Sequence, residues 1–505
     1  MSEILLNGKS LTLNDIVNVA RFGAKIALCP EAAKAVSTSR GYVERLLEEG
    51  RKVYGISTGF GEFAKVAIPP HQVKELQRNL IVSHACGVGQ LFSDEVVRAI
   101  MLLRINALSS GFSGIRLEVL QTLIDMVNAG VHPIIPEKGS LGASGDLAPL
   151  AHMALPLIGL GEARYNGEYM SGAQAMAKAG IVPVELAAKE GLALINGTQV
   201  MCGIGALIVH DAKQLMKLAD ISAAMVMEAL NGVTDAYNPK LHALRPHKGQ
   251  MDTAANVLKL LEGSERTTRQ GEMRIQDAYS LRCVPQIHGA SKDALDYVEQ
   301  RLLTEINSVT DNPIILEDED TAISGGNFHG QPMALAFDFL GIAISEIANV
   351  SERRIERLVN PALSGLPAFL TENGGLNSGF MIAQYSAASL VSENKVLAHP
   401  ASVDSIPSSA GQEDHVSMGT ISARKAAEIL FNAKRVIGIE LVAACQAIDL
   451  GDGSKKLGTG TSVAYDIIRK VIPKLDEDRE LYIDFEKVAL LIDTEIISEA
   501  VWEMI

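Results

Sequence analysis

Tryptophan, cysteine and aromatic residues in general are scarce in this chain. Its 505 residues include one tryptophan, and Phe, Trp and Tyr together make up only 5%, so Leu, Ala, Ile, Val and Met must fill the core. The five cysteines are odd in number, far apart and never spaced as CxxC. This argues against a disulfide framework and against a cysteine zinc site, and it indicates a reducing compartment.

Long apolar runs and basic clusters are also missing. The most apolar stretch, residues 147–160, is interrupted by Pro149, His152 and Pro156, and the N-terminal MSEILLNGKS has no basic-then-apolar signal. The net charge of −15, from 45 basic and 60 acidic residues, disfavours nucleic acid and acidic membranes as partners. The sequence therefore predicts a soluble, cytoplasmic protein.

Common nucleotide, zinc and serine-hydrolase motifs do not occur. Gly8-Lys9-Ser10 could end a phosphate loop, but Glu3 stands where the first glycine belongs. The runs Gly203-Ile204-Gly205 and Gly458-Thr459-Gly460 begin like dinucleotide fingerprints and lack the third glycine. There is no HExxH among the eleven histidines and no GxSxG elbow. We therefore expect neither a nucleotide cofactor nor a metal.

The chain changes character near residue 205. Before that point short β-like runs alternate with helices, and glycine-rich loops begin at Gly55, Ala85 and Gly139. Beyond it, three long segments carry apolar stripes at helical spacing. The stripes are Leu215, Leu218, Ile221 and Met225; Leu295, Val298, Leu302, Ile306 and Val309; and Phe337, Leu340, Ile344 and Ile347, continued by Ile355 and Leu358. We predict a mainly α protein with a mixed, glycine-loop-rich N-terminal domain (1–200) and a long-helix bundle with C-terminal helices (201–505) as oligomerisation core.

The run GSLGASGDLAPLAHMAL, residues 139–155, has two interpretations. In the first it is a glycine-rich loop leading into a helix, with Ser144 or Asp146 as N-cap. In the second the backbone kinks until the nitrogen of Gly145 meets the carbonyl carbon of Ala143, so that a five-membered ring closes and loses water. Loss of a second water from Ser144 leaves a methylidene-imidazolone, an electrophile that no ordinary side chain provides.

Six further motifs favour the second interpretation. They are VYGISTGFG around Tyr54, NLIVSHACGVG from Asn79, LINGTQ from Leu194, RIQDAYSLRC from Arg274, SGGNFHGQP from Ser324 and SIPSSAGQEDHVSMG from Ser405. With the Ala-Ser-Gly run, they resemble the aromatic amino-acid ammonia-lyases and aminomutases over most of the chain. The resemblance implies a fumarase/aspartase-like helical core and a homotetramer whose active sites are shared between subunits. It also implies a 4-methylidene-imidazol-5-one formed autocatalytically from Ala143-Ser144-Gly145, with no external cofactor.

The resemblance assigns catalytic roles to individual residues. The substrate amine would add to the methylene carbon of the former Ser144, which makes it a better leaving group. Tyr54 would remove the β-proton, if positive or hydrogen-bonding surroundings stabilise its phenolate. Asn196, Gln276 and Tyr279 match residues around the ring and the reacting groups, where neutral donors can stabilise charge on the ring oxygen.

Substrate binding is assigned in the same way. Arg282 matches the residue that binds the substrate carboxylate, and Phe328 matches an apolar wall. The pair Ser83-His84 and the run Gln412-Glu413-Asp414 resemble the histidine-specific version of the family. A carboxylate at Glu413 can accept from an imidazole N–H, whereas beside a phenyl ring it would be left unpaired. The expected reaction is elimination of ammonia from L-histidine to give trans-urocanate.

Alternatives to this reaction stay open. Ala278 stands where the family pattern has proline, and Gly411 stands where it has asparagine. These departures leave room for a tyrosine or phenylalanine ammonia-lyase or aminomutase on the same scaffold. A fumarase-like lyase without an internal ring and a non-catalytic helical assembly protein are further alternatives. The intact tripeptide, together with Tyr54, Asn196 and Arg282, argues against the non-catalytic protein.

Overall fold

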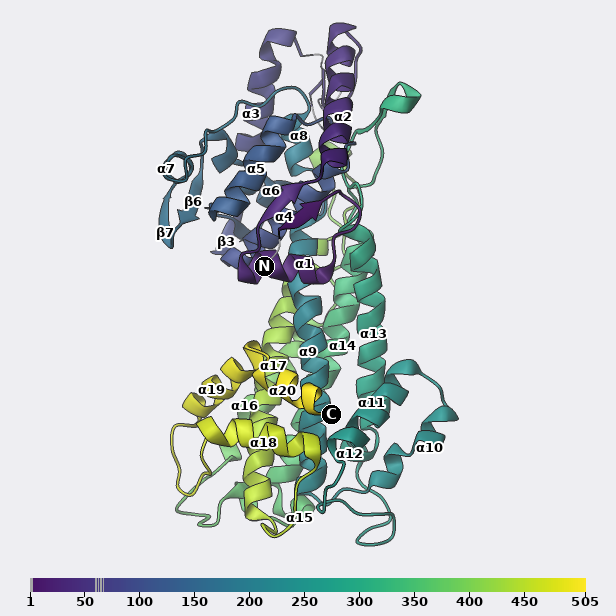
Figure 1. The fold of residues 1–505 in the computed structure, drawn as a ribbon, viewed down its shortest axis with the longest axis vertical. Helices are drawn as coiled ribbons and strands as arrows, with labels where there is room; N and C mark the ends of the chain where they lie inside the picture. Colours follow the sequence, from purple (N-terminus) through teal and green to yellow (C-terminus); the bar gives the residue numbers. More distant parts are fainter. Residues whose placement is uncertain (1–2, 60, 62, 64–65, 67) are drawn as a thin grey trace. The chain divides into compact units, whose positions relative to one another are not determined.

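The chain forms two compact units, each discontinuous in sequence. The structure, a computed structural model, describes residues 3–59, 61, 63, 66 and 68–505. Unit 1 comprises Met1–His210, Glu299–Asp338 and Pro400–Arg424, and unit 2 comprises Asp211–Val298, Phe339–His399 and Lys425–Ile505. Helices dominate both units (Figure 1), which confirms the predicted mainly α fold.

Unit 1 combines helices with small sheets. Its elements are β1 (Ile4–Leu6), α1 (Leu13–Phe22), β2 (Ile26–Leu28), α2 (Pro30–Glu48), α3 (Val73–His84), β3 (Val88–Leu91), α4 (Asp94–Ser109), α5 (Leu117–Ala129), β4 (His132–Pro133), β5 (Pro136–Lys138), α6 (Leu147–Ala154), β6 (Glu162–Tyr165), β7 (Glu168–Ser171), α7 (Gly172–Lys178), α8 (Glu190–Ile195), β8 (Ile314–Leu316) and β9 (Thr321–Ile323). β1 and β2 pair in parallel, and the pairs β3–β5 and β8–β9 and the sheet β4–β6–β7 are antiparallel. No sheet among the described residues exceeds three strands, so helices provide most of the core.

Local sequence signals explain where several elements begin. The hydroxyl of Thr12 accepts from the backbone N–H of Asp15, whose carboxylate accepts in return from the Thr12 N–H at 3.0 Å, and this capping box starts α1. α2 starts with Pro30, whose fixed φ suits the first helical position. Beyond α2, the loop that carries Tyr54 is anchored by Ile56, which is fully buried in an apolar cluster. The other buried members of that cluster are Tyr42, Val43, Leu46, Val73, Ala188 and Ile315.

Four long helices contribute residues to both units. They are α9 (Gln199–Ala229), α13 (Val284–Glu305), α14 (Gln331–Val359) and α17 (Gly419–Leu450). The predicted stripes lie on the first three of them, and Leu215, Ile221, Leu302 and Ile344 are each at most 1% exposed. Ile306 and Val309 lie beyond the end of α13. By length and composition α14 could span a membrane, but 67% of its most apolar window is buried, as in the core helix of a globular protein.

Shorter helices complete unit 2. The helices are α10 (Pro239–Ala243), α11 (Lys248–Leu260), α12 (Tyr279–Arg282), α15 (Pro361–Ser364), α16 (Met381–Leu397), α18 (Thr459–Val471), α19 (Leu481–Asp493) and α20 (Ile496–Met504).

Buried polar and charged side chains contact one another in the core of unit 2. Nδ1 of His288 bonds Asp220 at 3.0 Å, and its Nε2 lies 3.4 Å from Nη1 of Arg354. Since arginine can only donate and carboxylate only accept, His288 is the neutral Nδ1–H tautomer. Arg354 in turn pairs with Glu440.

The observed units differ from a division at residue 200. Unit 1 extends to His210, and it also contains residues 299–338 and 400–424, which the sequence places in the helical domain. The physical reason is packing against the N-terminal part. Ile315 of β8 joins the apolar cluster on α2, and Met418 donates its N–H to the carbonyl of Leu141 at 3.0 Å.

Candidate active site

The Ala-Ser-Gly run forms a tight turn in unit 1. The N–H of Gly145 points back to the carbonyl of Gly142 at 3.3 Å, which places Ala143 and Ser144 at the two central positions. Ser144 has a φ of +53°, and Gly142 and Gly145 have φ of +91° and +81°. A left-handed serine between left-handed glycines is a strained conformation that an ordinary helix entry does not need. The turn gives the backbone of residues 143–145 a sharp bend.

A second segment clamps this turn in place. Gly197 donates its N–H to the carbonyl of Ser144 at 3.1 Å, and its own carbonyl accepts from the N–H of Asp146 at 2.8 Å. A Cβ on Gly145 would lie 2.1 Å from the oxygen of Gly197, so only glycine fits there. The clamp brings Asn196, the neighbour of Gly197, beside the tripeptide.

Asp146 stands at the N-cap position of the helix that follows it, as the first interpretation of the sequence predicts. Its side chain, however, makes no capping hydrogen bond to α6. Instead, its buried carboxylate accepts from the N–H groups of Val200 and Met201, both at 2.9 Å, at the start of α9, and from the hydroxyls of Ser140 and Thr420. Burial raises the pKa of Asp146 to about 6, although these four hydrogen bonds oppose the shift.

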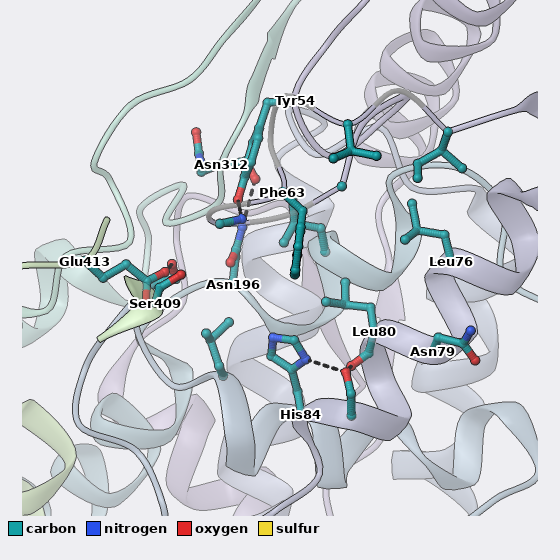
Figure 2. Close-up of a pocket in the computed structure, with 18 of the residues that line it drawn as sticks. Tyr54, Phe63, Leu76, Asn79, Leu80, His84, Asn196, Asn312, Ser409 and Glu413 are labelled. Atoms are coloured by element: carbon teal, nitrogen blue, oxygen red, sulfur yellow. Dashed lines mark hydrogen bonds between the residues drawn. The ribbon is translucent and has the colours of Figure 1, made fainter. Parts of the chain in front are cut away.

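Five of the predicted site residues line one cavity of about 800 Å³ in unit 1. They are Tyr54, His84, Ser144, Asn196 and Glu413 (Figure 2). Much of the remaining wall is apolar and includes Phe63, Val66, Ile68, Leu76, Leu80, Leu147 and Leu192. Ala143 and Gly145 line an adjoining cavity of about 240 Å³, which His84 and Glu413 also border. The fold therefore gathers segments that are up to 359 positions apart in the sequence.

Tyr54 lies in the turn after α2. Its hydroxyl oxygen accepts from the N–H of Gly61 at 3.2 Å. Burial raises the pKa of Tyr54, the Gly61 N–H opposes the rise, and the negative charge of Glu413 adds to it. The surroundings within this unit therefore disfavour the phenolate, whereas the catalytic role predicted for Tyr54 requires surroundings that favour it.

His84 and Glu413 present acceptors to the cavity. Ser83 donates its only hydroxyl proton to the carbonyl of Leu80 at 3.2 Å, so its oxygen accepts from Nδ1–H of His84 at 3.1 Å. The other ring nitrogen of His84 points into the cavity (Figure 2). Burial lowers the pKa of His84, which favours the neutral ring. Glu413 accepts from the hydroxyl of Ser408 at 3.2 Å and from that of Ser144 at 3.4 Å.

Asn196 is tied to residues that the sequence motifs did not single out. Its Nδ2 donates to the carbonyl of Asn312 at 2.8 Å and to Oδ1 of Asp311 at 3.3 Å. Asp311 is paired with Lys189, and both side chains are fully buried. Arg104, also fully buried, donates to the carbonyl of Asn196. Only Arg104 gave a sequence signal, as a lone charge in the apolar run MLLRINAL.

Three predicted site residues belong to unit 2. Arg282 and Tyr279 lie on α12, where the guanidinium carbon of Arg282 is 4.6 Å from the Tyr279 ring centre. Tyr279 is 68% exposed, and Gln276 precedes α12 and lines a separate cavity of about 190 Å³. Phe328 lies in unit 1, in the loop between β9 and α14, half-buried and outside the described cavity lining. The roles predicted for these four residues stay predictions.

Metal chemistry has no ligand set in the described part of the chain. No group of three or more His, Cys, Asp and Glu side chains there could hold a metal ion. The arrangement around the tripeptide instead combines a strained backbone turn, a tyrosine, a histidine, an amide and a carboxylate in one cavity. These groups can bind a polar small molecule and transfer protons.

Known proteins resemble this chain over its full length. The family described as aromatic amino acid lyase matches residues 11–470. A histidine ammonia-lyase of Alkaliphilus oremlandii is 64% identical over 501 residues, which are 99% of each chain. The solved histidine ammonia-lyase of Trypanosoma cruzi is 44% identical with a TM-score of 0.93, covering 100% of this chain and 96% of that one. The tyrosine aminomutase of Streptomyces globisporus is 39% identical with a TM-score of 0.96, covering 100% and 99%.

Fold, site and comparisons together define a carbon–nitrogen lyase with a mainly helical core. The chain belongs to the aromatic amino acid lyase family.

Proposed function

We propose that this protein eliminates ammonia from L-histidine and releases trans-urocanate. The observation that carries the proposal is the placement of Glu413 and His84 in the same cavity as Ser144. A carboxylate and an imidazole nitrogen that both accept hydrogen bonds suit an imidazole substrate and disfavour a phenyl ring. The relative at 64% identity bears the name histidine ammonia-lyase, which supports the same substrate.

The turn at Ala143-Ser144-Gly145 fits the internal ring that the resemblance implies. The N–H of Gly145 is turned back onto the carbonyl of Gly142 at 3.3 Å, and the hydroxyl of Ser144 reaches the cavity, where it donates to Glu413. When formed, the 4-methylidene-imidazol-5-one supplies an electrophilic carbon that turns the amine into a better leaving group. We propose that no external cofactor takes part.

Tyr54 is the proposed base for the β-proton, and its pKa decides when it can act. Because burial and Glu413 both raise that pKa, the phenolate needs cations that the cavity itself does not hold. None of the described residues that line the cavity is lysine or arginine. The substrate ammonium and an arginine from elsewhere would supply the missing charge.

We further propose that the arginine is Arg282 of another subunit in a homotetramer. Arg282 contacts the Tyr279 ring in unit 2, and Gln276 and Tyr279 are exposed there. Exposed apolar residues of unit 2 support assembly through helix faces: Phe339 and Ile342 of α14 are 44% and 45% exposed, beside the half-exposed Tyr297 of α13.

Subunit complementation tests the shared site. Tyr54→Phe and Arg282→Lys should each be inactive, and mixing them under subunit exchange should restore part of the activity. Recovery is expected because some sites then combine an intact Tyr54 with an intact Arg282. Absence of recovery despite exchange, demonstrated with differently tagged subunits, would contradict sharing.

The substrate is tested against the main alternatives. A tyrosine aminomutase shares this fold at 39% identity, so L-histidine, L-tyrosine and L-phenylalanine should be compared for unsaturated and β-amino acid products. We expect urocanate, followed by its ultraviolet absorbance, to form far faster than the products of the other two. Faster turnover of tyrosine or phenylalanine would replace histidine as the proposed substrate.

The proposed location is the cytoplasm. The cysteines of the described structure are all free thiols, and two of them, Cys202 and Cys445, are buried. Free thiols in this number suit a reducing compartment.

A further inference from the structure

The partners of Asn196 fix which end of its amide faces the cavity. Its Nδ2 lies 2.8 Å from the carbonyl oxygen of Asn312 and 3.3 Å from Oδ1 of Asp311. Both partners can only accept, so both amide hydrogens are directed at them and the amide cannot be flipped. The atom left for the cavity is Oδ1, an acceptor (Figure 2). The family resemblance predicts a neutral donor at this position, whereas the structure presents an acceptor.

Asp311 is held in this arrangement by a buried cation. Its Oδ2 lies 2.7 Å from Nζ of Lys189, and both side chains are fully buried. Its Oδ1 also accepts from the N–H of Asn312 at 2.6 Å. The carboxylate therefore has fixed partners on both oxygens and cannot turn away from Asn196.

Lys189 has a second unusual feature. It precedes α8 with a φ of +74°, in the left-handed region that a residue with a side chain rarely adopts. Burial lowers the pKa of its ammonium, and the charge of Asp311 opposes that shift. A strained backbone and a buried charge on one residue are features that gather at functional sites. The main chain of Asn196 is fixed as well, because its carbonyl accepts from the buried Arg104.

We propose that Lys189 and Asp311 are positioning residues that orient the Asn196 amide so that its Oδ1 accepts a hydrogen bond from the amino group of the substrate. An amine or ammonium offers N–H donors, and the turn at Ser144 that receives this amine is clamped to Gly197, the residue after Asn196. The inference rests on the proposed ammonia-lyase activity. Neither residue touches the substrate, and both act through Asn196.

A double-mutant cycle with Asn196 tests whether Lys189 and Asp311 influence kcat through the Asn196 amide. Asp311→Asn alone would leave Lys189 charged and unpaired in the interior, so the test variant is Lys189→Met/Asp311→Asn, which removes both charges and keeps the volume. In it, the new amide at position 311 can donate to Asn196, which frees the Asn196 amide to turn its donors toward the substrate. We expect kcat to fall about 10- to 100-fold.

In the Asn196→Ala background the same double variant should lower kcat by no more than about threefold, because the amide that it orients is already gone. Lys189→Arg keeps the ion pair and should retain kcat within about threefold. The control is Lys434→Met, which breaks a different ion pair, partly buried, to Asp211 at 2.8 Å in unit 2. It should lower the melting temperature and leave kcat unchanged.

The outcomes separate this inference from the proposed function. The positioning role would be overturned if the double variant lowered kcat as much in the Asn196→Ala background as it does in the wild-type background. It would also be overturned if Lys189→Arg lowered kcat as much as the double variant does. A double variant whose mass lacks the loss of about 36 Da for two waters would overturn it too, since the effect would then lie in ring formation. Wild-type protein that forms no urocanate at all would instead overturn the proposed function.

Discussion

Gly145→Ala tests most directly whether the close contact between Gly145 and Gly197 is needed for ring formation. The added Cβ would stand 2.1 Å from the oxygen and 2.4 Å from the carbon of Gly197, both backbone atoms. To reach an ordinary contact of 3.4 Å, the two segments must separate by roughly 1.3 Å. That shift breaks the hydrogen bonds from Asp146 to Gly197 and from Gly197 to Ser144, at about 1 kcal/mol each.

The backbone strain adds to this loss. A side chain at a φ of +81° costs about 1 to 2 kcal/mol, so we expect Gly145→Ala to lower the free energy of unfolding by about 3 to 4 kcal/mol. Displacement of the Gly145 nitrogen should also prevent ring closure. The variant should then keep both waters, so that its mass lacks the decrease of about 36 Da, and it should form no urocanate.

Gly130→Ala is the matched control. Gly130 ends α5 with a φ of +77°, almost the same as Gly145, but a Cβ there meets nothing within 4 Å. This variant should lose only the strain energy of about 1 to 2 kcal/mol and keep both the mass loss and the activity. If Gly145→Ala behaved like Gly130→Ala, with two waters lost and normal turnover, the clamp at Gly197 would not determine ring closure.

Three further changes test other parts of the site and the core. Ser144→Ala should fold but lose activity by several orders of magnitude, since the electrophile needs its side chain; urocanate formation near the wild-type rate would exclude the ring. Glu413→Gln should lower kcat/KM for histidine and reduce the ratio of kcat/KM for histidine to kcat/KM for phenylalanine or tyrosine. An unchanged ratio would mean that Glu413 does not select the substrate side chain. Burial lowers the pKa of His288, so the unfolded chain takes up a proton that the folded chain does not, and stability should fall as the pH drops below about 6.5. His288→Gln should flatten the melting temperature against pH between about 5 and 7, and an unaltered slope would assign that dependence to other groups.

Motifs predict the cavity residues well because each one stands in a distinctive local pattern. Tyr54, His84, Ser144, Asn196 and Glu413 come from five separate motifs, and the structure places all five around one cavity. Helical stripes predict three of the four long helices, since burial on one side imposes a spacing that the sequence displays directly, whereas α17 was not predicted by a stripe. Local pattern and tertiary structure agree at these positions.

Other features depend on pairings that no local pattern reveals. Lys189 and Asp311 are 122 positions apart and look like surface charges in the sequence, yet both side chains are fully buried. The division of the chain into units is of the same kind, because segments 299–338 and 400–424 pack into unit 1 through contacts with distant residues. The pKa of Tyr54 is raised by burial, and burial is set by the whole cavity wall.

Gly197 shows why these distant segments function as one unit. Its N–H and its carbonyl hold the Ser144 turn by hydrogen bonds. It is also covalently bonded to Asn196, whose side-chain amide donates to Asp311. A substitution at Gly197 would be strained, because side chains rarely adopt its φ of +125° and a Cβ there would approach the Gln199 side chain to 2.5 Å. The turn at Ser144 and the side chain of Asn196 are therefore positioned through the same residue, Gly197. A displacement of Gly197 would disturb formation of the ring and recognition of the amine together, whereas a change at Asp311 should disturb only the amine.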